Sequence, residues 1–241
     1  MTLSLVIPST PNHFQYVDCI IKNYLEGTVI PDEIIISVSN SHQIDSKIFD
    51  SLIDKYLETY PNLTIIKHNH TVYEGPNRGE GSKVAKYELI SYHDSDDIPH
   101  PQRIEIIKHF FNKFDINHLN HSYKYEIGFD NIDFGKIKYI SPNELYNSHF
   151  GENNNYAERP LDLYPNPNDK AYGCMFGFHV CGGPTTIHRS VLNTIKWNQD
   201  KILSYDYDFC MDVLFTLKKS MIIDSPLIWY NKVSNASWAC E

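Results

Sequence analysis

Short apolar runs and amphipathic stretches alternate along the N-terminal part of the chain. Residues 3–8, 33–39 and 63–67 are largely apolar and rich in β-branched side chains, which predicts three strands, the first of them buried. Residues 14–24 carry apolar side chains at helical spacing, and residues 47–59 form the second predicted helix. This order predicts crossover connections and a largely parallel sheet covered by helices on both faces.

Residues at the boundaries predict where these elements begin and end. Pro8 cannot donate a hydrogen bond to a sheet ladder, so we expect the first strand to end there. Asn12 and Ser46 precede the two helices and are candidates for their N-terminal caps.

A glycine-rich segment, residues 72–82, follows the third strand. Gly75, Gly79 and Gly81 permit close approach of the backbone, and a short helix is expected over residues 82–86. The start of such a helix would offer free amides to an anion. Taken alone, however, the pattern favours a plain loop.

Three carboxylates in four residues follow the fourth predicted strand, residues 89–93. Asp94, Asp96 and Asp97 repel one another, and a divalent cation would relieve that repulsion. Mg²⁺ and Mn²⁺ take oxygen ligands and keep coordination positions for substrate phosphates. The alternative is a solvated acidic turn in front of the helix predicted over residues 101–114.

The positions of four segments favour the metal interpretation over the acidic turn. Ligands of open α/β sheets bind beyond the carboxyl ends of the parallel strands. Residues 9–10, 39–40, 75–81 and 94–97 all follow predicted strands and should converge on one crevice.

The second half of the chain gives weaker signals. Strands are expected over residues 123–129, 136–140, 221–224 and 227–230, and helices over residues 184–195 and 205–215. The polar segment 143–170 has little periodicity, and a loop of that length is usually functional or mobile. His118 and His121 have a spacing that would suit zinc, but no cysteine pair lies nearby in the sequence to support it.

Composition and charge narrow the possible classes of protein. A chain of 241 residues fits one large domain, and no apolar run reaches the roughly 18 residues that a membrane span needs. The net charge of −9 argues against a nucleic-acid-binding protein, so no nucleic acid partner is expected. An acidic protein that handles a phosphorylated ligand would recruit a metal ion as the bridge.

The cysteines and the N-terminus indicate in which cellular compartment the protein is expected. The five cysteines are odd in number and scattered, which suits free thiols in a reducing compartment. The N-terminus has no basic region ahead of its apolar run, which argues against a signal peptide. We therefore expect a soluble cytoplasmic protein. The Asn-, Ile- and Lys-rich composition hints at an AT-rich genome, and a viral source would place the protein in the host cytoplasm.

With these motifs in view, the chain resembles the nucleotide-sugar-dependent glycosyltransferases of the GT-A fold, close to the inverting family 2 group. The most specific string is Asp94-Ser-Asp-Asp-Ile-Pro-His-Pro-Gln-Arg103, supported by Ile7-Pro-Ser-Thr10 and Gly75-Pro-Asn-Arg-Gly79. A weaker similarity covers residues 182–232, and residues 115–172 show none.

The resemblance implies a fold and a division of the chain. It implies an α/β protein with a Rossmann-like, mostly parallel central sheet, helices on both faces and a smaller acceptor-side subregion. One GT-A-like domain would span residues 1–241. Residues 1–114 would form its nucleotide-sugar-binding half and residues 115–241 its acceptor-binding half.

The resemblance also implies a reaction and the residues that carry it. The enzyme would move a sugar from a nucleoside-diphosphate sugar to an acceptor hydroxyl, with inversion, and Asp206 would be the general base, with Asp208 as its substitute. Mn²⁺ or Mg²⁺ would be held by Asp94, Asp96 and Asp97. The donor would be a UDP-, GDP- or TDP-sugar, and the acceptor a glycan, a lipid or a protein. The residues expected to contact the donor are Pro8, Ser9, Thr10, Ser39, Asn77, Arg78, Asp94 and Ser95.

Three positions depart from the family pattern. Residues 39–41 read Ser-Asn-Ser where the family usually has an aspartate pair, which leaves the identity of the nucleotide open. Tyr205 stands where a glutamate usually precedes the base, and Lys232 stands where a histidine is frequent.

Two other functions stay open at the level of sequence. One is a non-catalytic glycan- or nucleotide-binding module of the same fold. The other is a sugar nucleotidyltransferase, against which residues 9–13 count, because they contain no glycine and no lysine or arginine.

Overall fold

A single mixed sheet organises the described part of the chain. The structure is a computed structural model that describes residues 1–124, 130–140, 183–200 and 205–230. Within these ranges nine strands pair in one sheet. In chain order they are β1 (Leu3–Ser9), β2 (Glu33–Val38), β3 (Leu63–Lys67), β4 (Leu89–Tyr92), β5 (Ile98–Pro99), β6 (His118–Lys124), β7 (Lys138–Ile140), β8 (Thr186–His188) and β9 (Ser220–Trp229).

The strand order across the sheet is β3-β2-β1-β4-β8-β6-β9-β5, and β7 also pairs with β9. The four strands β3, β2, β1 and β4 are parallel neighbours, which confirms the crossover connections predicted from the sequence. β8 runs antiparallel to both β4 and β6, whereas β6 and β9 are parallel to each other. The sheet is therefore mostly parallel, as expected.

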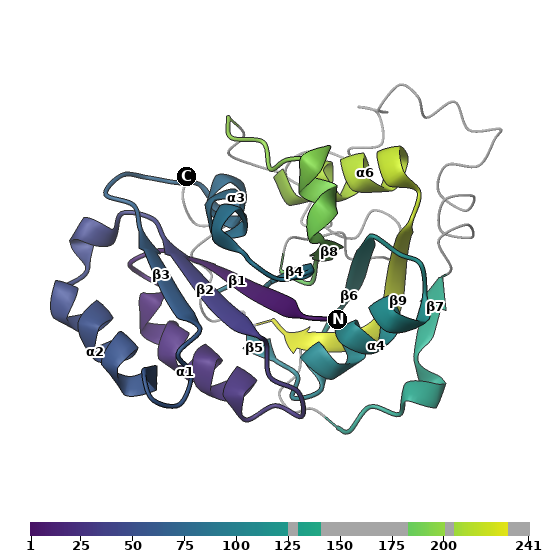
Figure 1. Cartoon of the computed structure of the whole chain (residues 1–241), viewed down its shortest axis with the longest axis horizontal. Coiled ribbons are helices and arrows are strands. Elements are labelled where there is room, and N and C mark those ends of the chain that lie inside the picture. The colour runs from purple at the N-terminus through teal and green to yellow at the C-terminus, as the bar shows by residue number, and fades with distance from the viewer. Residues whose placement is uncertain (125–129, 141–182, 201–204, 231–241) are drawn as a thin grey trace.

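Helices cover both faces of the sheet (Figure 1). They are α1 (Phe14–Leu25), α2 (Ser46–Tyr56), α3 (Glu74–Val84), α4 (Arg103–Lys113) and α6 (Tyr205–Leu217), with the 3-10 helices η1 (Ser41–Gln43), η2 (Phe134–Lys136) and η4 (Arg189–Asn193). α1, α2 and α4 pack on one face, and α3 and α6 lie over the other.

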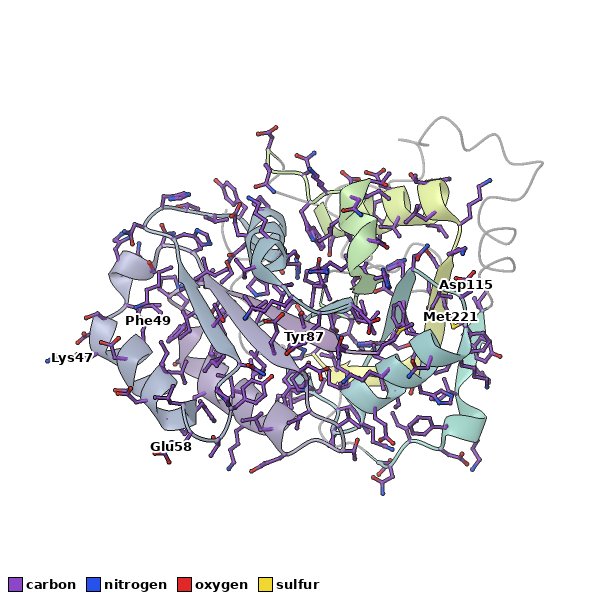
Figure 2. The ribbon with its side chains drawn as sticks, viewed as in Figure 1. Lys47, Phe49, Glu58, Tyr87, Asp115 and Met221 are labelled. Carbon is purple, nitrogen blue, oxygen red and sulfur yellow. The ribbon has the colours of Figure 1, made fainter. Side chains whose placement is uncertain are left out.

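Alternation along the strands explains the two core layers. Leu5 and Ile7 of β1 face the layer with α1, α2 and α4, whereas Val6 faces the layer with α6. In α2, Phe49 points inward and is 2% exposed, while Lys47 points outward (Figure 2). Burying each such side chain contributes about 1.5–3 kcal/mol relative to leaving it in water.

Three predicted boundary features were wrong. Pro8 lies inside β1, because its ring nitrogen faces the side of β4, which pairs with β1 only as far as Val6. The Asp45 side chain accepts a hydrogen bond from the Lys47 amide at 3.0 Å, so Asp45 rather than Ser46 caps α2. The cap position of α1 is His13 without a side-chain hydrogen bond, so Asn12 does not cap that helix.

The glycine-rich segment is a helix, not the predicted loop. α3 begins at Glu74, and a Cβ on Gly81 would lie 2.4 Å from Val6 Cγ1, whereas a Cβ on Gly79 would lie 3.3 Å from Trp197 Cβ. The glycines let the helix pack closely on β1 and on the segment after η4. The buried face of α3 is made of Gly, Pro, Asn, Arg and Ser residues, so the segment lacks the apolar periodicity from which a helix is predicted.

The later elements differ in detail from the predictions. Residues 184–195 form β8 and then η4 instead of one helix, and β6 begins at His118, ahead of the expected strand. Instead of two late strands, residues 220–229 form one continuous strand, β9, in which Pro226 is accommodated at a register irregularity opposite Ser122. The helix over 205–215 is confirmed as α6. The segment 143–170 and Lys232 lie outside the described residues.

The possible zinc pair has other partners. His118 Nδ1 lies 3.0 Å from the Ser220 hydroxyl, and His121 Nε2 accepts a hydrogen bond from Arg103. Among the helices of the described ranges, none is both long and apolar enough to cross a membrane.

Candidate functional site

The first turns of α3 lie over the carboxyl ends of β1 and β2. Asn77 donates two hydrogen bonds from its side-chain amide, to the carbonyl of Ser9 at 3.3 Å and to that of Ser37 at 2.9 Å. The backbone amide of Ser39 donates to the Ser9 carbonyl at 3.0 Å. Ser9, Ser39 and Asn77, predicted from separate segments, therefore meet at one edge of the sheet, as the parallel topology requires.

The N-terminus of α1 completes this edge. The Thr10 carbonyl accepts hydrogen bonds from the amides of His13 and Phe14, at 3.1 and 2.9 Å, and so starts the helix directly after β1. The Thr10 side chain is exposed, while Pro8 is buried within the strand. Thr10 is thus accessible beside the buried residues of the edge.

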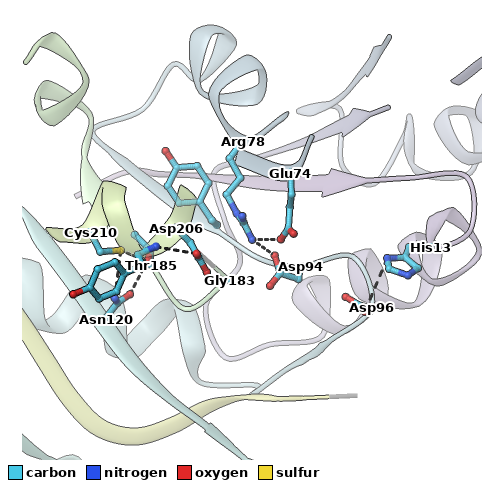
Figure 3. Close-up of polar contacts among 12 residues, drawn as sticks. His13, Glu74, Arg78, Asp94, Asp96, Asn120, Gly183, Thr185, Asp206 and Cys210 are labelled. Atoms are coloured by element: carbon cyan, nitrogen blue, oxygen red, sulfur yellow. Dashed lines mark hydrogen bonds and ion pairs between the residues drawn. The ribbon is translucent and has the colours of Figure 1, made fainter. Parts of the chain in front are cut away.

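A buried arginine connects α3 to the acidic loop after β4 (Figure 3). Arg78 is 1% exposed, and its Nη2 atom donates hydrogen bonds to the carboxylates of Glu74 and Asp94. Its guanidinium lies 5.5 Å from the centre of the Trp197 ring, within the range of a cation–π contact. One cation therefore fixes two carboxylates from different elements.

Asp94 is enclosed from two sides. One carboxylate oxygen is held by Arg78, and a Cβ on Gly183 would lie 2.5 Å from the other, so the backbone at Gly183 packs against it. Burial raises the pKa of the Asp94 carboxyl, Arg78 opposes this, and the carboxylates of Glu74 and Asp96 raise the pKa further. Three carboxylates, those of Glu74, Asp94 and Asp96, thus lie around one guanidinium, and a bound cation would stabilise the ionised form of Asp94.

The other residues of the acidic loop differ in their accessibility. The Asp96 side chain is 17% exposed, and its Oδ2 atom lies 4.0 Å from His13 Nδ1. Asp97 is 1% exposed, and its backbone carbonyl accepts a hydrogen bond from His93 Nε2 at 3.1 Å. Ser95 is buried as well. Asp94 and Asp96 are thus the acids of this loop that approach solvent.

These carboxylates suit a metal ion that also binds a ligand. Within the described ranges, no three His, Cys, Asp or Glu side chains converge closely enough to hold a metal ion by themselves. Mg²⁺ is commonly held by one or two carboxylates together with phosphate oxygens and water. The carboxylates of Asp94 and Asp96 fit this arrangement of one or two carboxylates with phosphate oxygens and water.

Asp206 and Asp208 lie in the first turn of α6. Asp206 is partly exposed, and its Oδ1 atom accepts a hydrogen bond from the Tyr207 amide at 2.8 Å. Asp208 is 9% exposed. The close-up draws Asp206 together with Gly183 and Asp94, although they come from different segments (Figure 3). Of the two predicted bases, Asp206 is the more accessible.

A buried polar cluster lies beneath the first turns of α6. The Thr185 hydroxyl donates to Asn120 Oδ1 at 2.7 Å and lies 3.3 Å from the sulfur of Cys210. Burial, opposed by the hydrogen bond between the thiol and the Thr185 hydroxyl, raises the pKa of Cys210 to about 12, and the charge of Asp206 adds to the rise. This thiol therefore stays protonated, and the cluster anchors α6 to β6 and β8.

Sequence reasoning missed Glu74 and His13 as members of this site. Glu74 and Arg78 are four residues apart, the spacing at which oppositely charged side chains pair along a helix. That signal was hidden because the segment was expected to be a loop. The proximity of His13 to Asp96 follows from the tertiary structure and had no signal in the sequence.

Comparison with known proteins places this site in a family. The family model described as "Glycosyl transferase family 2" matches residues 4–192. The chain belongs to glycosyltransferase family 2. The match includes the acidic loop and all of α3, and it ends in η4. No curated protein matches this family 2 chain in sequence.

Solved structures with the same fold include TarS from S. aureus and a synthase from Mycobacterium tuberculosis. TarS residues 1–349 from S. aureus align with a TM-score of 0.65 and 14% identity, over 96% of this chain and 60% of that one. The complex of the same TarS fragment with UDP-GlcNAc gives a TM-score of 0.64 and 14% identity, over 95% of this chain and 58% of that one.

Glucosyl-3-phosphoglycerate synthase from Mycobacterium tuberculosis, in complex with Mn²⁺, UDP and glucosyl-3-phosphoglycerate, gives a TM-score of 0.60 and 12% identity. That alignment covers 95% of this chain and 72% of the synthase. The chain therefore spans about 60% of the TarS fragment and more of the synthase. At these identities the likeness confirms the GT-A type of fold.

Proposed function

We propose that this chain transfers a sugar from a nucleoside-diphosphate sugar to an acceptor hydroxyl, with inversion at the anomeric carbon. The observation that supports this most is the joining of Arg78 and Asp94 at the carboxyl end of β4, with Asp96 beside them. A diphosphate needs this combination of a cation and carboxylates that recruit a metal ion. The division into a donor half, residues 1–114, and an acceptor half, residues 115–241, belongs to the same proposal.

The donor would occupy the edge of the sheet formed by the ends of β1, β2 and β4. Ser9, Ser39 and Asn77 meet there through hydrogen bonds, and Thr10 is exposed beside them. The proposed donor-binding residues are Pro8, Ser9, Thr10, Ser39, Asn77, Arg78, Asp94 and Ser95. Ser95 and Pro8 are buried, so in this proposal they shape the site from behind.

Mn²⁺ or Mg²⁺ would be held by Asp94 and Asp96, with Asp97 supporting the loop from within. When bound, such an ion offsets the negative charge that develops on the leaving diphosphate. The carboxylates of this chain fit the role because burial and the neighbouring carboxylates disfavour the ionised form of Asp94, and a bound cation would stabilise that form.

Asp206 would act as the general base for the acceptor. Its carboxylate would take the proton of the acceptor hydroxyl while the hydroxyl oxygen forms a bond to the anomeric carbon. The bond from that carbon to the diphosphate breaks in the same step, and a single displacement inverts the centre. A positioned base contributes about 10²- to 10⁴-fold to the rate. Asp208 remains the alternative base.

The donor class is tested first with uridine nucleotides. The compared structures of TarS and of the mycobacterial synthase contain UDP-GlcNAc or UDP, which favours a UDP-sugar for this chain. GDP- and TDP-sugars complete the panel, because residues 39–41 lack the aspartate pair usual in the family. The acceptor, whether glycan, lipid or protein, is proposed to bind on the side of α6.

The experiment measures release of nucleoside diphosphate from the donor panel with Mn²⁺ and with EDTA. Wild type is compared with Asp96→Asn and with Asp54→Asn, a matched change at an exposed position of α2. We expect release with one nucleotide, loss of release with EDTA and in Asp96→Asn, and unchanged release in Asp54→Asn. Metal-dependent binding without release, in the presence of candidate acceptors, would instead indicate a binding module. Absence of metal-dependent binding of every donor would refute the metal–diphosphate site.

A further inference from the structure

Arg103 lies at the start of α4 and is fully buried, with 0% exposure. It is the last residue of the acidic string, but no role in the site described above falls to it. A fully buried guanidinium is expensive unless its donors are all satisfied. The hydrogen-bond partners of Arg103 therefore indicate which segments of the chain it holds in place.

The guanidinium donates to four groups from four segments. Nε donates to His121 Nε2 of β6 at 3.0 Å, and Nη1 donates to the Tyr24 hydroxyl of α1 at 2.9 Å. Nη2 donates to two backbone carbonyls, that of Tyr92 at the end of β4 at 2.9 Å and that of Gly183 at 3.2 Å. Arg103 is therefore a single junction between β4, β6, α1 and the segment before β8.

The positive charge of Arg103 is not neutralised by these partners. Because Nε of Arg103 donates, His121 Nε2 must accept, so Nδ1 of this neutral imidazole donates to the Ser122 carbonyl at 3.0 Å. Burial raises the pKa of Tyr24 to about 12, so its hydroxyl remains protonated. Within the described ranges, Arg103 has no carboxylate partner.

Two of the four bonds lead directly to Asp94. Tyr92 is two residues before Asp94 on the same strand end, and Gly183 packs its backbone against Asp94 Oδ2. The same Nη2 atom thus holds the strand that carries Asp94 and the backbone that lies against its carboxylate. Loss of either bond would let the two walls of the Asp94 site move apart.

We propose that Arg103 is a positioning residue that fixes the Asp94 carboxylate by holding the Tyr92 and Gly183 carbonyls together. Lysine cannot replace it, because its single ammonium group lacks the planar fork that reaches partners in several directions. The activity readout of this proposal rests on the proposed transferase function, whereas its structural readout does not.

The test compares wild type with Arg103→Lys by hydrogen exchange and by Mn²⁺ titration with UDP, followed by electron paramagnetic resonance. We expect amide exchange in residues 93–97 to rise about tenfold or more, while residues 33–38 of β2 exchange as in wild type. We expect the half-saturating Mn²⁺ concentration to rise about 10- to 100-fold, as for other residues that support metal ligands. Donor turnover should fall by a similar factor.

Two further variants make the result specific. Arg189→Lys is the control, because Arg189 is exposed and, in the described part of the chain, its guanidinium donates only to the Ala85 carbonyl, at 3.3 Å. It should leave every readout unchanged. Gly183→Ala should weaken Mn²⁺ binding with Arg103 intact, because the added Cβ would press on Asp94. Should Arg103→Lys fail to fold, Tyr24→Phe removes one bond and is expected to raise exchange in residues 93–97 to a smaller extent.

The proposal and the transferase function fail in different ways. Wild-type protein that turns over no donor would refute the function, while exchange in residues 93–97 would still decide the role of Arg103. A uniform rise in exchange across the sheet, with unchanged Mn²⁺ half-saturation in Arg103→Lys, would reduce Arg103 to a general stabilising residue and overturn the proposal.

Discussion

Replacing Gly81 with alanine would force a methyl group into the contact between α3 and β1. A Cβ at this position would lie 2.4 Å from Val6 Cγ1 and 3.6 Å from the other Val6 methyl. Val6 is 0% exposed at the centre of the sheet, so its side chain has no solvent-facing rotamer to adopt. The strain must therefore be taken up by movement of the helix or of the strand.

Two opposing effects determine how much the Gly81→Ala substitution lowers the free energy of unfolding. Inserting a methyl group into a packed core costs about 1–3 kcal/mol, and a contact this short lies in the upper part of that range. Alanine in a helix interior gains about 1 kcal/mol over glycine, which offsets part of the cost. The net loss is about 1–2 kcal/mol, and for a chain of this length it lowers Tm by about 2–8 °C.

Urea denaturation of matched variants tests this reasoning. Gly79→Ala is the control, because it gains the same helix propensity but meets the flexible end of Gln199 at 3.1 Å and Trp197 Cβ at 3.3 Å. We expect Gly79→Ala to lie within about 0.5 kcal/mol of wild type. In a Val6→Ala background, which removes the clashing methyl groups, Gly81→Ala should become neutral or stabilising.

The reasoning is refuted if Gly81→Ala alone is as stable as wild type or more stable. That result would mean that residue 81 does not lie against Val6, and that the close packing of α3 on β1 is wrong. A loss in Gly81→Ala that persists unchanged in the Val6→Ala background would place the cost elsewhere in the helix.

Two other outcomes concern a buried histidine and the proposed base. Burial lowers the pKa of His118 from its usual 6.5 to about 4, so between these values the unfolded chain binds more protons and stability falls as the pH drops. Between pH 7 and pH 4.5, His118→Gln should therefore lose less of its free energy of unfolding than wild type, by up to about 3 kcal/mol, as measured by urea denaturation at the two pH values. An equally large loss in the variant would contradict this prediction. Asp206→Asn should lower kcat about 10²- to 10⁴-fold with little change in donor KM. A larger loss in the matched Asp208→Asn variant would move the base to Asp208.

The N-terminal half of the fold was predictable because its signals are local. The parallel strands β1, β2 and β4 are buried on both faces and the edge strand β3 is partly buried, so each appears in the sequence as a short apolar run. The alternation of these runs with amphipathic helices then permits few topologies. The position of the acidic loop at the end of β4 follows from the same pattern, and the family match over residues 4–192 agrees with it.

The second half was harder because its strands pair over long separations. β6 lies between β8 and β9, and β4 pairs with β8 almost one hundred residues later in the chain. β8 is only three residues long, and the helical pattern of the sequence around it led to the wrong prediction of one helix over residues 184–195. Whether a short segment forms a strand in a mixed sheet depends on the strands that it pairs with, and sequence periodicity does not predict those partners.

The sequence by itself determined which residues would stand at the edge of the sheet, because strand periodicity and chain order place Ser9, Ser39 and Asp94 at parallel carboxyl ends. Only the tertiary structure decided how they are held. Arg78 reaches Asp94 because glycines let α3 approach β1, and Gly183 encloses Asp94 from almost ninety residues away. Close approach between distant segments depends on the space left after packing, and local patterns carry no information about that space.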